Sequence, residues 1–192
     1  MSGKFHCVDL KDHFCHKLVY RELPEKGGFG LDDICILRSN YFKGEKVVLN
    51  GAEFQLASGG KDNIRCENQQ INAEAYAEKV HILGFAYWGQ NYDYARILFE
   101  DGSEEKFRLL LPDWAYELGA EHLSMQSEKY GCTVETAKVF PSSGRLLHFI
   151  YLYHFGYKLK KSGKIAKIVL PDNMFMLSLI HISEPTRRVV IS

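Results

Sequence analysis

Apolar and polar residues alternate along much of this chain, and the alternation is clearest between residues 62 and 114. There the sequence reads DNIRCENQQI, KVHILGFAYWG, YARILFEDGSEEKFRLLL and finally PDW. A period of two places successive side chains on opposite faces, as in a β-strand, and Asn, Asp and Gly stand where turns are expected. The stretch therefore predicts a run of antiparallel strands.

Turn residues divide the remaining sequence into short strands with almost no helix, which is typical of a β-sandwich or barrel. Asn50-Gly51 and Asp101-Gly102 predict two hairpins. Residues 73–78 are expected to form a polar connection, and Trp114–Leu118 a helical turn. The expected strands are Lys4–Leu10, Ile34–Leu37, Lys46–Asn50, Glu53–Ala57, Ile64–Cys66, Gln69–Asn72, Lys79–Tyr87, Tyr92–Glu100, Glu104–Leu111, Arg145–Tyr157, Lys164–Leu170 and Asn173–Leu179.

Composition places the chain among ordinary single-domain proteins. At 192 residues and 46% hydrophobic residues it is long enough to bury a core without disulfide bonds. Positive and negative side chains number 24 each and form no basic segment, which argues against a nucleic-acid partner. No apolar run approaches the roughly 20 residues that span a bilayer, and the start, MSGKFHCVDLKDHF, lacks the apolar stretch of a signal peptide. We expect neither membrane insertion nor export.

The cysteines support the same view. Their number is odd and none forms a C-x-x-C pair, whereas a secreted domain of this size more often carries an even set. They are Cys7, Cys15, Cys35, Cys66 and Cys132. We expect reduced thiols, mostly buried as small apolar side chains, and a cytoplasmic location is favoured.

The C-terminal residues look foreign to the domain. Leu177 to Arg187 read LSLIHISEPTR, and all eleven residues resemble the in-frame translation of a transposase-type sequencing adapter. On this interpretation residues 1–176 form one β-sandwich domain and residues 177–192 are a non-native tail. The alternative is a natural apolar strand with a frayed end. In both cases LSLIHI is β-prone enough to occupy the last strand position.

A set of short motifs follows an order known from one class of β-domain. They are an opening VDL, a DN-x-x-C-x-x-Q-x-I segment, an LG strand, a DGS hairpin, a DW end, an H-x-x-Y strand and an LPDN turn. Their residues are Val8-Asp9-Leu10, Asp62-Asn63, Cys66, Gln69, Ile71, Leu83-Gly84, Asp101-Gly102-Ser103, Asp113-Trp114, His148, Tyr151 and Leu170–Asn173. The order resembles the galactose-binding-like jelly-roll modules found beside glycoside hydrolase catalytic domains, particularly those acting on α-linked galactose and fucose.

This resemblance implies an all-β jelly-roll sandwich of two antiparallel sheets, a non-catalytic carbohydrate-binding role and a glycoside hydrolase catalytic domain as partner. The chain departs from the pattern in three places. Asn68 stands where a Gly is expected, the usually small and polar loop after Leu83-Gly84 is aromatic, and the adapter-like tail replaces the closing strand. The ligand preference of the family is therefore no guide to the ligand of this chain.

The aromatic loop is the best candidate for a ligand-binding surface. Its rings suit the C–H faces of a sugar, and its amide and carboxylate groups suit hydroxyls. The residues are Tyr87, Trp88, Gln90, Asn91, Tyr92 and Asp93. The alternative is that Tyr87 and Trp88 cap the core while the polar residues form a tight turn. Trp114 is expected in the core.

Metal ligands and catalytic groups are weakly indicated. The residues His6, Cys7, His13, Cys15 and His16 lack the spacing of a zinc site, and a strand there would turn neighbours to opposite faces, so accidental clustering is favoured. We expect no resident cofactor. A structural calcium ion is the open alternative, because sandwiches of this class often carry one, and its candidate ligands are Asp32, Asp33, Asp62 and Asn63.

No G-x-S-x-G, P-loop or G-x-G-x-x-G motif is present. A glycosidase needs two carboxylates across a cleft, but the acidic residues of the Asp101-Gly102 hairpin, Glu100 to Glu105, are expected to be solvated turn charges. His148 and Tyr151 face opposite sides of a strand. The sequence thus favours a non-catalytic carbohydrate-recognition module. Its alternatives are a structural or protein-interaction domain that orients a catalytic partner or forms an oligomer, and a small β-fold enzyme.

Overall fold

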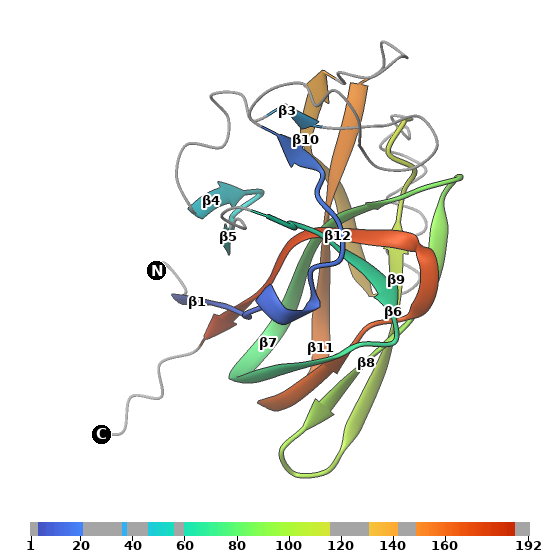
Figure 1. Ribbon diagram of the computed structural model, residues 1–192. Helices are drawn as coiled ribbons and strands as arrows, with labels where there is room; N and C mark the ends of the chain where they lie inside the picture. The colour runs from blue at the N-terminus through green and yellow to red at the C-terminus, as the bar shows by residue number, and fades with distance from the viewer. Residues whose placement is uncertain are drawn as a thin grey trace.

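Strands form nearly all the regular structure of this protein. The computed structural model describes residues 4–20, 36–37, 46–55, 60–115, 131–141 and 149–186. Within these ranges the one helical element is a 3-10 turn of three residues, and most strands join a single antiparallel sheet (Figure 1). The described part of the chain contains no helix long and apolar enough to cross a bilayer. The predicted all-β class is confirmed.

The predicted strands appear in the predicted order, with two pairs of them each merged into one strand. The elements are β1 (Lys4–Cys7), η1 (Lys11–His13), β2 (Val19–Tyr20), β3 (Ile36–Leu37), β4 (Lys46–Leu49), β5 (Ala52–Gln55), β6 (Ile64–Glu67), β7 (Gln70–Ala86), β8 (Asn91–Phe99), β9 (Glu104–Leu111), β10 (Cys132–Pro141), β11 (Phe149–Val169) and β12 (Asp172–Thr186). Of these, η1, β2 and β10 were not predicted from the sequence.

Two long strands, β7 and β11, form the centre of the main sheet. Among the described residues this sheet has eight strands in the order β1-β12-β7-β11-β8-β9, with β10 added to β11 and β6 added to β12. The first half of β11 carries β10 on its free side, whereas its last residues carry β8. A register shift between Lys158 and Gly163 of β11 lies between these two halves. On the side away from β7, strand β11 therefore pairs with β10 along its first half and with β8 near its end.

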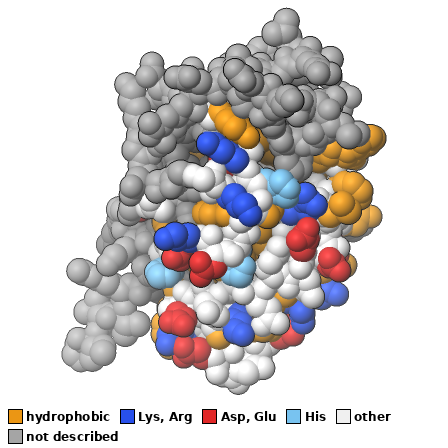
Figure 2. Space-filling model, in the orientation of Figure 1, with side chains coloured by type: hydrophobic (Ala, Val, Ile, Leu, Met, Phe, Trp, Pro, Cys, Tyr) orange, Lys and Arg blue, Asp and Glu red, His pale blue; other side chains and the backbone are white. Residues whose placement is uncertain are grey.

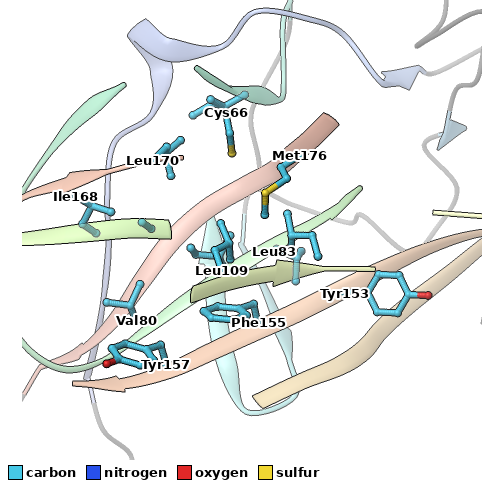
Figure 3. Close-up of a cluster of buried hydrophobic side chains, with 14 of the residues drawn as sticks. Cys66, Val80, Leu83, Leu109, Tyr153, Phe155, Tyr157, Ile168, Leu170 and Met176 are labelled. Atoms are coloured by element: carbon cyan, nitrogen blue, oxygen red, sulfur yellow. The ribbon is translucent and has the colours of Figure 1, made fainter. Parts of the chain in front are cut away.

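The sheet packs against itself, and the core lies between the two halves. Phe107 of β9 stacks on Phe155 and Tyr157 of β11, with ring centres 5.9 and 4.6 Å apart, although β10 rather than β9 is hydrogen-bonded to this part of β11. Leu109 of β9 and Leu83 of β7 belong to the same cluster of buried side chains (Figure 3). Each fully buried side chain of this kind contributes about 1.5–3 kcal/mol relative to an exposed one. The contact between the halves thus stabilises the fold.

Two turns form as their dipeptides predict. Asn50 and Gly51, between β4 and β5, have φ angles of 48° and 76°, and Gly102, between β8 and β9, has a φ of 82°. Asn50-Gly51 thus has positive φ at both central positions, the type I′ geometry whose twist matches that of the adjoining strands, whereas in the second turn only the glycine has positive φ. In this second hairpin Asn91, the first residue of β8, pairs with Leu111 of β9. The hairpin therefore also fixes the end of the aromatic loop.

Residues 73–78, which were expected to form a polar connection, belong to β7 instead. Ala73, Ala75 and Ala77 are buried and the residues between them are exposed, which is the period of a strand. Glu74 has a φ of 51°, and the register with β11 shifts beside it, as in a β-bulge. The prediction was wrong because the low β-propensity of Ala and Glu is overridden by pairing with β11.

The two strands expected at Arg145–Tyr157 and Lys164–Leu170 form the single strand β11, while residues 145–148 lie outside the described residues. The later strand β12 includes most of the adapter-like segment. Its backbone pairs with β6 and β7, and its last residues pair with β1. The expectation that this β-prone segment occupies the last strand position is confirmed for the backbone. The domain division at residue 176 and the two-sheet jelly roll stay predictions.

Candidate functional site

The turn between β7 and β8 holds two consecutive residues in the left-handed backbone region. Trp88 has a φ of 66° and Gly89 a φ of 96°. The Gly89 N–H donates a hydrogen bond to the carboxylate of Asp113, and the side-chain amide of Asn91 donates to the Gly89 carbonyl at 3.0 Å. Left-handed backbone costs a residue other than glycine about 1–2 kcal/mol. These hydrogen bonds therefore maintain a conformation that tryptophan by itself disfavours.

Residues 112–114, which follow β9, fix the base of this turn. The Ala86 N–H donates to the Pro112 carbonyl at 2.7 Å, and the Trp114 N–H donates to the Ala86 carbonyl at 3.0 Å. The Tyr151 N–H of β11 donates in turn to the Trp114 carbonyl at 2.8 Å. The segment thus ties the end of β7 to β11. Trp114 is buried, so its predicted place in the core is confirmed.

Three aromatic rings lead from the core to the surface. The Tyr87 ring stacks on the buried Trp114 ring with an interplanar angle of 10° and centres 6.4 Å apart. Trp88 meets Tyr87 edge to face, with centres 5.7 Å apart. The Trp88 side chain is 68% exposed, whereas Tyr87 is half-buried. Tyr87 is therefore a support, and Trp88 is the ring that the turn presents to solvent.

A second pair of exposed rings lies on the outer face of the β8–β9 hairpin. Tyr92 and Tyr94 are both more than half exposed. The Arg108 guanidinium lies 3.4 Å from the centre of the Tyr92 ring, and the Lys106 ammonium lies 4.2 Å from that of Tyr94. Such cation–π contacts hold the rings in place at the surface. Tyr92 was predicted from the sequence as a candidate; Tyr94 and Arg108 were not.

Sequence reasoning also missed two exposed apolar residues of β12. Met174 and Phe175 are 56% and 42% exposed, and the Tyr87 N–H donates to the Phe175 carbonyl at 2.8 Å. This bond places Phe175 beside the aromatic turn. Figure 2 shows hydrophobic side chains gathered along the right-hand edge of the visible face. The run Met174-Phe175-Met176 was a signal, because strict alternation cannot bury three consecutive large residues in one core.

The polar candidates of the loop are partly committed to the turn itself. The Asn91 amide group donates to the carbonyls of both Gly89 and Tyr87. One carboxylate oxygen of Asp93 accepts from the Tyr94 N–H at 2.6 Å, and Gln90 is half-buried. The polar residues therefore form a tight turn, as one alternative from the sequence has it, but Trp88 is exposed and does not cap the core.

The calcium candidates divide between two parts of the chain. Asp32 and Asp33 lie outside the described residues. Asp62 and Asn63 are buried, and Asp62 accepts hydrogen bonds from the Leu18 N–H at 2.8 Å and from the Asn63 amide at 3.2 Å. Calcium takes six to eight oxygen ligands, far more than these two residues supply. In the described part of the chain their role is to fasten residues 16–18 to β6.

The acidic residues of the β8–β9 hairpin differ from one another. Asp101 accepts a hydrogen bond from Lys161 at 2.8 Å in solvent, and hydrogen bonds from Lys161 and Ser103 hold its pKa well below the usual range. Glu105, expected to be a solvated charge, is buried instead. It accepts from the Tyr157 hydroxyl at 2.8 Å and from the Lys160 N–H at 3.0 Å. Burial and this carboxylate raise the pKa of Tyr157. Glu105 thus links β9 to β11.

No protein-family model matches this chain, and no curated protein sequence matches it. The function must therefore be argued from the arrangement of the described side chains.

Proposed function

We propose that this protein is a non-catalytic recognition module for carbohydrate and that the turn between β7 and β8 contacts the sugar. The observation that carries the proposal is the state of Trp88. Its ring is 68% exposed although its backbone occupies the costly left-handed region. Backbone strain of this kind clusters at binding sites. Because burial of the ring contributes little here, we infer that the Trp88 side chain contacts a ligand.

The groups around Trp88 suit a sugar. The C–H face of a pyranose packs on an aromatic ring, and its hydroxyls need directed hydrogen-bond partners. Tyr92 adds a second exposed ring, and the guanidinium of Arg108 lies against it with its N–H donors. Asp93 supplies a carboxylate at the start of the same strand. The two rings and the carboxylate therefore occur close together in sequence, and Arg108, which carries the donors, is in direct contact with Tyr92.

Support beneath Trp88 favours binding without a large rearrangement. Tyr87 stacks on Trp114, and the turn is fastened to Asp113 and Asn91. A contact surface that is already ordered loses little conformational entropy when the ligand binds. The proposal also includes the galactose-binding-like jelly roll and a glycoside hydrolase catalytic domain as partner. The order of the sequence motifs supports both, and the all-β class is consistent with the fold.

A glycan array with the purified chain tests the carbohydrate proposal. We expect binding to a small set of oligosaccharides, and calorimetry with the best of them should show about a tenfold loss of affinity for Trp88→Ala and Tyr92→Ala. Tyr76→Ala is the matched control, because Tyr76 is also exposed but lies in the first half of β7. The proposal is wrong if no glycan binds, or if the control weakens binding as much as Trp88→Ala does.

A protein-interaction domain is the second candidate, and Met174 and Phe175 favour it. Two consecutive exposed apolar side chains beside an exposed Trp88 extend the apolar surface beyond what one sugar ring covers. If this surface joins two copies of the chain, light scattering should show a dimer, and Phe175→Ser should dissociate it. On this alternative the glycan array should show no binding. A monomer at all concentrations would remove the self-association form of this alternative.

A further inference from the structure

Cys15 and His16 lie against strand β6, and two ladder-like hydrogen bonds hold them there. The Cys15 N–H donates to the Asn63 carbonyl at 2.9 Å, and the Asp62 N–H donates to the His16 carbonyl at 2.8 Å. This placement corrects the expectation that neighbouring residues here point to opposite faces of a strand. The segment after η1 is not a strand. The side chains of Cys15 and His16 are therefore not on opposite faces, and they contact each other.

The Cys15 sulfur faces two nitrogen atoms at hydrogen-bond distance. The Nδ1 atom of His16 is 3.0 Å from Sγ, and the backbone N–H of Arg65 donates to the same Sγ at 3.2 Å. The Asn63 carbonyl lies 3.5 Å from Sγ on the acceptor side. The carbonyl can accept a hydrogen bond from the S–H of the protonated thiol, and the two N–H groups can donate to the sulfur of the thiolate.

Arg65 determines which nitrogen of His16 carries the proton. Its Nη2 atom lies 3.0 Å from Nε2 of His16, and a guanidinium can only donate. Nε2 must therefore accept, so the proton of the neutral ring is on Nδ1, where it points at the Cys15 sulfur. Burial and the charge of Arg65 lower the pKa of His16, which keeps the ring in this neutral form near pH 7.

Cys7 is half-buried, as Cys15 is, but two of the other described cysteines offer a contrast within the same chain. Cys66 is fully buried, and burial raises the pKa of its thiol to about 12. Burial also raises the pKa of the Cys132 thiol. Cys15, by comparison, is only half-buried. Reactivity of a thiol depends on access and on stabilisation of negative charge at sulfur.

We propose that Cys15 is a site of oxidative modification, reacting with hydroperoxides under the direction of His16 and Arg65. The sulfur attacks one peroxide oxygen, so that an S–O bond forms as the O–O bond breaks. Sulfur is oxidised by two electrons to the sulfenic acid, and the peroxide is reduced. With hydrogen peroxide the thiol proton joins the departing oxygen, which leaves as water. The N–H groups of His16 and Arg65 stabilise the negative charge on sulfur during the attack.

Competition among the cysteines of the folded chain tests this site. The protein is treated with less than one equivalent of hydrogen peroxide in the presence of dimedone, which captures sulfenic acids, and each cysteine peptide is quantified by mass spectrometry. We expect Cys15 to be labelled at least about tenfold faster than Cys66 and Cys132. Unfolding in denaturant should remove the preference. Equal labelling of the three cysteines in the folded chain, or a preference for Cys66, would overturn the proposal.

A histidine variant separates activation from simple exposure. His16→Phe should slow the labelling of Cys15 several-fold, because the Nδ1 donor is lost. His6→Phe is the matched control, since His6 is exposed on β1, and should leave the rate unchanged. Circular dichroism confirms that both variants are folded. A rate for His16→Phe equal to that of the wild type contradicts the assigned role, and the comparison of wild-type cysteines stands even if that variant does not fold.

Discussion

Strand β7 and the turn after it carry two opposite arrangements of ring side chains within eight residues. His81 is buried and contacts the buried His154 of β11, with ring nitrogens 2.7 Å apart. Trp88, by contrast, is an apolar ring exposed to water. One arrangement places titratable groups in the core, and the other places a large hydrophobic group outside it. The first makes stability depend on pH, whereas the second does not titrate and is free to serve recognition.

The histidine pair is held in a form that cannot gain a proton without loss of stability. The rings stack with centres 4.9 Å apart, and a 2.7 Å contact between two ring nitrogens requires one donor and one acceptor. Burial, with a further contribution from Lys79, lowers the pKa of His81 to about 3 and that of His154 to about 4. Nδ1 of His154 has no hydrogen-bond partner among the described residues. Both rings are therefore neutral in the folded chain near pH 7.

The largest expected effect is acid destabilisation through this pair. An unfolded histidine titrates near pH 6.5, so between that value and about pH 4 the unfolded chain binds more protons than the folded one. The free energy of unfolding should fall as the pH falls, by about 1.4 kcal/mol per pH unit for each histidine and about 4 kcal/mol in total by pH 5. Urea unfolding at several pH values measures this slope.

A double variant tests whether the slope belongs to the pair. His81→Leu combined with His154→Leu should flatten the profile between about pH 7 and about pH 5. His6→Leu, at an exposed position, should retain the wild-type slope. If the double variant loses stability on acidification as steeply as the wild type, the buried pair is not the cause.

The next effect concerns Gly84, which lies between the two regions on β7. A Cβ atom at Gly84 would collide with the carbonyl oxygen of Leu177 on β12, so Gly84→Ala must push two paired strands apart. We expect a loss of about 3 kcal/mol in the free energy of unfolding, measured in urea. Gly89→Ala is the control, because a Cβ there meets open space and only the φ of 96° is unfavourable, at a cost of about 1 kcal/mol. Equal losses would mean that β12 does not approach β7 closely.

Much of this architecture follows from local sequence signals. The Asn-Gly and Asp-Gly turns fix two hairpins, because Asn50, Gly51 and Gly102 are residues that readily adopt the positive φ angles of these turns. The alternation of apolar residues was enough to predict the all-β class, and the turn residues placed the aromatic loop between two strands. These features depend on neighbours in sequence, which is why the sequence contains them.

The remaining features depend on register between distant segments. His81 meets His154 because β7 and β11 pair with a particular offset, and a slip of one residue would turn every side chain to the other face. Alternation alone cannot supply that offset. His16 meets Arg65 because an isolated bridge joins His16 to Asn63, just before β6. Exposure of Phe175 likewise depends on the end of β7 lying beside β12. The candidate loop was therefore predictable, but not the side chains that join it from other strands.

The smallest effect distinguishes the two roles that Trp88 combines, a strained backbone and an exposed ring. At a φ of 66°, glycine avoids the steric cost that alanine meets, and the loss of an exposed ring removes little burial. Trp88→Gly should therefore be more stable than Trp88→Ala by about 1 kcal/mol, as measured by thermal unfolding. Both variants should lose glycan binding equally, because each removes the ring. If alanine proves the more stable, the left-handed turn is absent in solution, and if only one variant loses binding, the ligand is recognised through the backbone of the turn rather than through the indole.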